Sequence, residues 1–142
     1  MILNDKILNL LYKESYKALN SGEIPVSAVI VDESGKIVSF GRNNRQFKYN
    51  VLGHAEINAI LKAEKKLKDW RLDGYTLIVT LEPCSMCSMV IKESRIDNVY
   101  YFLSSKNREV NDFGINKKKI NDYPEFEAKF SELLTVFFND KR

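Results

Sequence analysis

All of the histidine and cysteine in the 142-residue chain is confined to two short motifs. The single histidine, His54, opens a His-Ala-Glu sequence, and the two cysteines, Cys84 and Cys87, form a Pro-Cys-x-x-Cys sequence. A cysteine pair at this spacing is typical of a redox pair, of half a zinc ribbon or of two buried thiols. A structural zinc ribbon needs four ligands, whereas three leave one position open, as in catalytic zinc sites. The fold must therefore bring both motifs together if they form such a site.

Both motifs lie at the starts of predicted helices. Apolar spacing predicts helices over residues 4–20, over residues 54–67 with Ile57, Ile60 and Leu61 facing inward, and near the C-terminus over the phenylalanine-rich stretch 126–138. A further helix is predicted over residues 83–93, with Pro83 at its start, where its missing N–H costs nothing. Runs rich in β-branched and aromatic residues predict strands over residues 24–31, 36–41, 75–81 and 99–103.

This order of elements predicts an α/β fold with a mixed sheet and helices on both of its faces. We found no internal repeat or linker, and 142 residues with 44% hydrophobic content suit a single domain over residues 1–142. No apolar run approaches the roughly 18 residues of a membrane span. The N-terminus lacks the basic region and apolar core of a secretory signal. We therefore expect a cytoplasmic protein with no membrane association.

Helix geometry indicates how the two motifs would share one site. Cys84 and Cys87 are about one turn apart at a helix start, where the helix dipole favours the thiolate that binds a metal. On an ideal helix His54 and Glu56 lie about 200° apart around the axis. They can serve one site only if the metal lies over the helix end. Glu56 would then face the open metal position as an acid/base without being a ligand.

Positive charge is concentrated around His54. Residues 36–72 carry nine Lys or Arg against three acidic residues, whereas the whole chain has a net charge of +3. Phe47 and Tyr49 are interleaved with this charge, a pattern suited to a phosphate backbone and unstacked bases. The lysines of residues 62–68 are more typical of a solvated helix face. Both interpretations stay open for three cations just before the site: Arg42, Arg45 and Lys48.

The combination of His-Ala-Glu and Pro-Cys-x-x-Cys, each at a strand-to-helix junction, resembles the zinc-dependent cytidine deaminase-like superfamily. Within it, the chain is similar to bacterial tRNA-specific adenosine deaminases over residues 22–103 and again in the Leu-Leu and Phe-Phe pairs near the C-terminus. The similarity rests on Glu-Ile-Pro-Val at residues 23–26, Trp-Arg-Leu at 70–72, Thr-Leu-Glu-Pro-Cys at 80–84 and Ser-Arg-Ile at 94–96.

The resemblance implies a three-layer α/β/α cytidine deaminase-like fold and a hydrolase acting on the C–N bond of a cyclic amidine. Its implied reaction deaminates adenosine to inosine at the wobble position of a tRNA anticodon, in a homodimer with one Zn²⁺ per subunit. His54, Cys84 and Cys87 would bind the zinc, and Glu56 would move protons. The implied substrate-binding residues are Asn43, Ala55, Leu81 and Glu82, and the candidate RNA contacts are Arg42, Arg45, Lys48, Phe137 and Phe138.

Some departures from the family concern the segments near the nucleic acid. Serine stands at position 27 where the family has glycine and at position 105 where it has aspartate, and the glycine-rich stretch is not recognisable within residues 104–123. One alternative is therefore a deaminase of a free nucleoside or nucleobase, such as cytidine or guanine. Another is a non-catalytic zinc-stabilised module that binds RNA or protein. Glu56 argues against the second, because a structural site has no use for a carboxylate at an open metal position.

Overall fold

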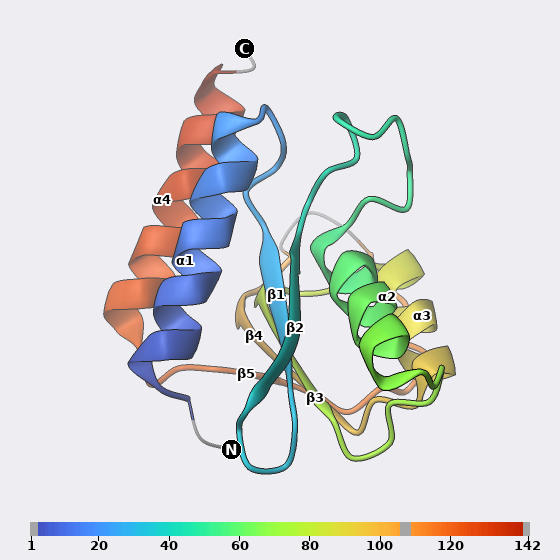
Figure 1. The fold of residues 1–142 in the computed structure, drawn as a ribbon. Helices are drawn as coiled ribbons and strands as arrows, with labels where there is room; N and C mark the ends of the chain where they lie inside the picture. Colours follow the sequence, from blue (N-terminus) through green and yellow to red (C-terminus); the bar gives the residue numbers. More distant parts are fainter. Residues whose placement is uncertain (1–2, 106–108, 141–142) are drawn as a thin grey trace.

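A five-stranded mixed sheet forms the middle layer of the molecule (Figure 1). The computed structural model describes residues 3–105 and 109–140. The strand order is β2-β1-β3-β4-β5, antiparallel from β2 to β3 and parallel from β3 to β5. The strands are β1 (Ser27–Val31), β2 (Ile37–Arg42), β3 (Thr76–Leu81), β4 (Asn98–Leu103) and β5 (Lys117–Lys119).

Two pairs of helices cover the two faces of this sheet, as predicted (Figure 1). Helices α1 (Asp5–Asn20) and α4 (Pro124–Asp140) lie on one face, and α2 (Ala55–Leu67) and α3 (Ser85–Ser94) lie on the other. Alternate side chains of β1 contribute to the two hydrophobic cores, because Val29 packs toward α1 and Ile30 packs toward α2. The chain thus has the expected three-layer α/β/α fold.

The predicted elements form, and several of their ends differ. Helix α1 begins where expected because the Asn4 side chain accepts a hydrogen bond from the Ile7 N–H at 2.9 Å. The first strand begins at Ser27 instead of residue 24, because the Val26 N–H bonds to the Ile24 carbonyl in a tight turn. Pro83 lies outside α3, whose N-cap is Cys84.

Two predictions about the chain's faces and edges need correction. Leu61 was expected to face inward but is 58% exposed. The buried positions of α2 form an arc of about 200° that contains Ile57 and Ile60 and ends before Leu61. The short strand β5 was not expected, because three consecutive lysines have no apolar alternation. It forms as an edge strand whose backbone pairs with β4.

Candidate metal centre and active site

The N-termini of α2 and α3 bring the two sequence motifs together on one face of the sheet. His54 is the N-cap of α2, Cys84 is the N-cap of α3, and Cys87 lies in the first turn of α3. The Nδ1 atom of His54 is 3.8 Å from the Sγ of Cys84 and 3.4 Å from that of Cys87. The prediction that these three residues come together at the starts of two helices is therefore confirmed.

The three donor atoms suit a zinc ion in both type and spacing. They all lie within 4.8 Å of one another. Ligand atoms on a tetrahedral zinc, at ordinary zinc–sulfur and zinc–nitrogen bond lengths, lie roughly 3.5–3.8 Å apart. The His54 Nδ1 separations of 3.4 and 3.8 Å match that spacing. His54, Cys84 and Cys87 would hold the ion and leave its fourth position to a non-protein ligand.

In the metal-free site, Cys84 is the cysteine that is already a thiolate, whereas Cys87 keeps its proton. Hydrogen bonds from the Cys87 thiol and then from His54 lower the pKa of Cys84 to about 3. The hydrogen bond with Cys84 in turn raises the pKa of His54 and, together with burial, that of Cys87. Metal binding would therefore release protons from Cys87 and His54, so the affinity should rise with pH.

Glu56 lies in the first turn of α2 and is only 4% exposed. Burial raises the pKa of its carboxyl to about 7. The carboxyl borders the same pocket as His54 and Cys84, which agrees with a metal placed over the end of α2. The remaining lining comes from Ile24, Val26, Asn43, Leu81, Glu82 and Ser105.

The four expected substrate-binding residues all lie at or beside this pocket. Asn43 Oδ1 accepts a hydrogen bond from the Ala55 N–H at 2.8 Å, so that N–H already has a protein partner. Leu81 and Glu82 form the opposite wall, at the end of β3. The Glu82 N–H donates to the Leu103 carbonyl at 2.8 Å and so belongs to the β3–β4 pairing.

The side chain of Glu82 is fixed by a lysine that sequence reasoning missed. Lys117, on β5, donates to Glu82 Oε2 at 2.5 Å, and the Ser105 N–H donates to Oε1 at 3.1 Å. Burial raises the pKa of Glu82, but the hydrogen bonds from Lys117 and Ser105 and the lysine's positive charge outweigh it and hold that pKa below its ordinary value. The edge strand thus supports one wall of the pocket.

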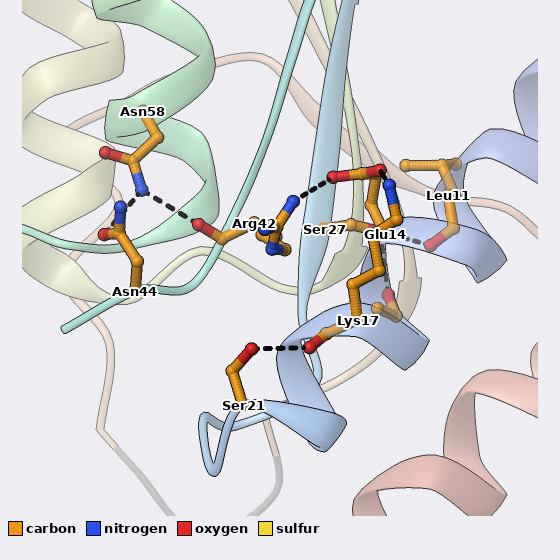
Figure 2. Close-up of polar contacts among 9 residues, drawn as sticks. Leu11, Glu14, Lys17, Ser21, Ser27, Arg42, Asn44 and Asn58 are labelled. Carbon is orange, nitrogen blue, oxygen red and sulfur yellow. Dashed lines mark hydrogen bonds and ion pairs between the residues drawn. The ribbon is translucent and has the colours of Figure 1, made fainter. Parts of the chain in front are cut away.

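The Arg42 side chain points toward Glu14 on α1 (Figure 2), which lies on the face of the sheet opposite α2 and α3. Its guanidinium donates to Oε1 of the buried Glu14 on α1 at 2.7 Å. Its carbonyl accepts a hydrogen bond from Asn58 Nδ2 at 2.8 Å, and the same nitrogen contacts Asn44 Oδ1 at 2.9 Å. Arg42 therefore joins α1, β2 and α2, and its charge is balanced within the fold.

The other candidate RNA contacts lie in two different layers. Arg45 borders a second hollow that also contains His54 and Cys84. Lys48 lies 5.2 Å from the centre of the Phe47 ring, on the same loop. Phe137 and Phe138 pack edge-to-face on α4, across the sheet from α2 and α3. Of these candidates, Arg45 therefore borders a hollow with the metal ligands, and Lys48 lies on the same loop.

Comparison with known proteins agrees with this geometry. The family model for the cytidine and deoxycytidylate deaminase zinc-binding region matches residues 1–103. The chain belongs to this family. Among curated members, it is 38% identical to the tRNA-specific adenosine deaminase of Aquifex aeolicus (strain VF5), over 95% of this chain and 93% of that protein. It is 44% identical to the one from Rickettsia bellii (strain RML369-C), where the match spans 63% of this chain and 62% of the relative.

Solved structures of other proteins share the fold. A structure from a study of A-to-I editing by tRNA:A34 deaminases at the wobble position has a TM-score of 0.82 and 28% identity, over 92% of this chain and 100% of the other. Guanine deaminase from Nitrosomonas europaea has a TM-score of 0.78 at 20% identity, over 95% and 86% of the two chains, which is a likeness of fold alone. Within residues 3–105 and 109–140, no helix has the length and apolar character to cross a membrane.

Proposed function

We propose that this chain is a zinc-dependent deaminase that converts adenosine to inosine at the wobble position of a tRNA anticodon. The observation that carries the proposal is the placement of the buried Glu56 carboxyl in one pocket with the zinc ligands His54 and Cys84. The match to the Aquifex aeolicus tRNA-specific adenosine deaminase, over nearly the whole of both chains, supports the choice of substrate. In this proposal residues 1–142 act as one deaminase domain in the cytoplasm.

Glu56 performs the proton transfers of the proposed reaction. Zinc held by His54, Cys84 and Cys87 supplies the Lewis acidity that makes water nucleophilic at neutral pH. The Glu56 carboxylate accepts a proton from the attacking water and delivers it to a ring nitrogen of adenine. Overall, water adds at C6, ammonia leaves and inosine remains. In the metal-free protein burial raises the pKa of Glu56 to about 7, so this carboxyl takes up a proton more readily than an exposed glutamate does.

The pocket walls orient the base for this chemistry. Asn43 Oδ1 is occupied by the Ala55 N–H, which leaves the Asn43 amide NH₂ to donate to an acceptor on the base. No other described residue is a partner of that NH₂ group. Leu81 supplies an apolar wall, and Lys117 and Ser105 hold Glu82 in place beside it. In the proposed substrate-binding set, Asn43 and Leu81 therefore contact the base, Ala55 orients the Asn43 amide, and Glu82 completes the wall beside Leu81.

Of the candidate residues, Arg45 and Lys48 are the ones that contact the RNA in the proposed complex. Both lie on the loop before His54, and Arg45 borders a hollow shared with His54 and Cys84. Arg42 is bound by Glu14, and Phe137 and Phe138 lie in the opposite helical layer. We also propose that the chain acts as a homodimer, as its resemblance to the bacterial enzymes implies.

The test is an assay of the zinc-loaded protein on an anticodon stem-loop with adenine at the wobble position. Free adenosine, cytidine and guanine are assayed in parallel. We expect inosine in the stem-loop and no turnover of the free compounds. Turnover of a free base or nucleoside alone would contradict the tRNA assignment while keeping the zinc chemistry.

A matched pair of variants separates an enzyme from a zinc-stabilised binding module. Glu56→Ala should retain zinc and lose turnover, whereas Cys87→Ala should lose the metal. Zinc removal provides a second comparison: it should abolish inosine formation by an enzyme, whereas a structural zinc module should mainly lose its fold. A chain that binds the stem-loop, contains zinc and forms no inosine would be a binding module instead.

A further inference from the structure

The loop between β2 and α2 exposes several apolar side chains beside the metal centre. We call residues 45–52 the aromatic loop. Phe47 is 68% exposed, Tyr49 97% and Val51 67%. Large apolar groups gathered on one exposed segment are typical of an interaction site. The loop ends just before His54, and its members Arg45 and Val51 border a hollow that also contains His54 and Cys84.

The backbone of the aromatic loop is held in one shape by a buried carboxylate. Glu23, which is 2% exposed, accepts hydrogen bonds from the N–H groups of Gln46 at 3.0 Å and Phe47 at 2.7 Å. Inside the loop, the Asn50 N–H donates to the Arg45 carbonyl at 3.0 Å, and Asn50 Oδ1 accepts from the Leu52 N–H at 3.0 Å. The exposed rings are thus attached to a backbone that hydrogen bonds hold in place.

Two backbone features close and shape the loop. Gly53 lies so close to the other end that an added Cβ would be 2.6 Å from Asn44 Oδ1, so the two ends can approach only because this residue is glycine. Tyr49 adopts a φ of 51°, which is unfavourable for an aromatic residue. The surrounding hydrogen bonds maintain that conformation and leave the tyrosine ring in solvent.

The charge of this segment identifies the kind of partner. Residues 42–55 contain three cations and no acidic residue. Arg42 is paired with Glu14, but neither Arg45 nor Lys48 forms an ion pair with any residue that the structure describes. Lys48 lies 5.2 Å from the Phe47 ring centre, a cation–π contact that places charge next to an aromatic face. Exposed rings beside unpaired cations suit single-stranded nucleic acid.

The loop is also continuous with the metal centre. Arg45 and Val51 line a hollow together with His54, Cys84, Met86 and Glu109. This hollow is separate from the Glu56 pocket but shares His54 and Cys84 with it. A strand whose target base entered the Glu56 pocket would therefore bring the neighbouring nucleotides to the aromatic loop.

We propose that the aromatic loop is a stacking platform for the nucleotides that flank the target adenosine in the RNA. Phe47 and Tyr49 stack on unpaired flanking bases, while Arg45 and Lys48 contact the adjoining phosphates. Glu23 is a positioning residue that holds the platform against the metal centre and touches no substrate. This proposal rests on the proposed function and specifies how that site recognises a strand in place of a free nucleoside.

The test compares Phe47→Ala/Tyr49→Ala with Trp70→Ala, an exposed aromatic control. Trp70 is 56% exposed and has the Arg71 guanidinium 5.8 Å from its ring centre, but it follows the C-terminal end of α2, away from His54. The measurements are KM and kcat for inosine formation in the stem-loop, and direct binding of a labelled stem-loop in a Glu56→Ala background. Zinc content and sedimentation are recorded for each protein.

The platform predicts that the double variant raises KM and weakens stem-loop binding by roughly ten- to a hundredfold, because base–aromatic stacking contributes on this scale. Its kcat and zinc content stay unchanged, and Trp70→Ala behaves as the unmodified chain does. Unchanged KM and binding in the double variant would overturn the proposal. A change in oligomeric state with unchanged intrinsic binding would also overturn it, and would assign the loop to contact with a second copy.

Glu23→Gln tests the positioning role separately. The carboxamide keeps the size of the side chain but presents one accepting oxygen where the carboxylate presents two, so one loop N–H loses its partner. We expect a rise in KM with little change in kcat, and a smaller additional effect of Phe47→Ala/Tyr49→Ala in this background. Full additivity of the two changes would show that Glu23 does not act through the loop.

The proposed function and the platform fail in different ways. If the unmodified chain forms no inosine in the stem-loop, the proposed function fails whatever the variants do. If the unmodified chain forms inosine and Phe47→Ala/Tyr49→Ala matches it in KM and binding, only the platform fails.

Discussion

Glu14 and Glu56 are equally buried, at 3% and 4% exposure, yet their surroundings differ sharply. Glu14, on α1, contacts two cations, Arg42 at 2.7 Å and Lys17 at 3.3 Å. Glu56, on the opposite side of the sheet, lies among metal-ligating residues, and burial raises its pKa to about 7. The comparison shows that burial alone does not define a carboxylate's role. The groups placed around it differ, since Glu14 is paired with cations and Glu56 lies beside metal-ligating residues.

The largest stability effect should come from Glu56 in the zinc-free protein. Because its pKa is raised from 4.5 in the unfolded chain to about 7, the folded state holds the extra proton between these pH values. The stability it contributes is present below pH 4.5 and is lost as the pH rises toward 7. Glu56→Gln should therefore stabilise the zinc-free chain by about 3 kcal/mol at pH 8 and by little at pH 4.5. Chemical denaturation at the two pH values measures this difference.

Equal stabilisation by Glu56→Gln at both pH values would contradict the raised pKa. Because Glu56 raises the pKa values of His54 and Cys87, the difference between the two proteins reports Glu56 together with its effect on these ligands.

Arg42→Ala tests the other side of the comparison. It leaves Glu14 buried with only Lys17 nearby, and we expect the free energy of unfolding to fall by about 2 kcal/mol. Stem-loop binding by the folded variant should be unchanged, because the guanidinium points toward α1 (Figure 2). Denaturation and binding assays measure the two effects.

The control for Arg42→Ala is Arg45→Ala, which should show the reverse pattern of weaker stem-loop binding and unchanged stability. Weaker stem-loop binding by Arg42→Ala would contradict this account and show that Arg42 contacts the RNA.

A half-buried carboxylate, Glu82, should give the smallest effect. Both members of its pair with Lys117 are about 15% exposed, whereas Lys119 and Glu127 are about a third exposed. We expect Lys117→Ala to lower the free energy of unfolding by about 1 kcal/mol and Lys119→Ala to lower it by less than about 0.5 kcal/mol. Denaturation measures both variants. Equal losses of stability would show that burial of the Lys117–Glu82 pair adds nothing to its contribution.

Local sequence signals were enough to predict most of the fold and the metal centre. The helix caps, the β-branched runs and the two motifs are each contained in a few consecutive residues. The motifs therefore predicted that His54 and Cys84 would lie at the starts of two helices, and the structure places them at the N-caps of α2 and α3. The inward face of α2 was misjudged at Leu61, because a small shift of the buried arc moves a flanking residue into solvent.

Features that depend on distant partners were not predictable in the same way. Strand β5 consists of three lysines and exists because β4 offers its backbone as a partner. The direction of Arg42 depends on Glu14, 28 positions earlier, and the fixing of Glu82 depends on Lys117, 35 positions later. Charge sign and spacing along the chain contain no information about such pairs.

The most direct test of the account measures zinc content and inosine formation for the unmodified chain and Glu56→Gln side by side, on the anticodon stem-loop. The account predicts about one zinc per chain in both proteins, since Glu56 is not a ligand. It also predicts that inosine formation falls by at least about a hundredfold in the variant. A Glu56→Gln protein that binds zinc and retains near-normal turnover would contradict the assignment of Glu56 as the proton-transferring group.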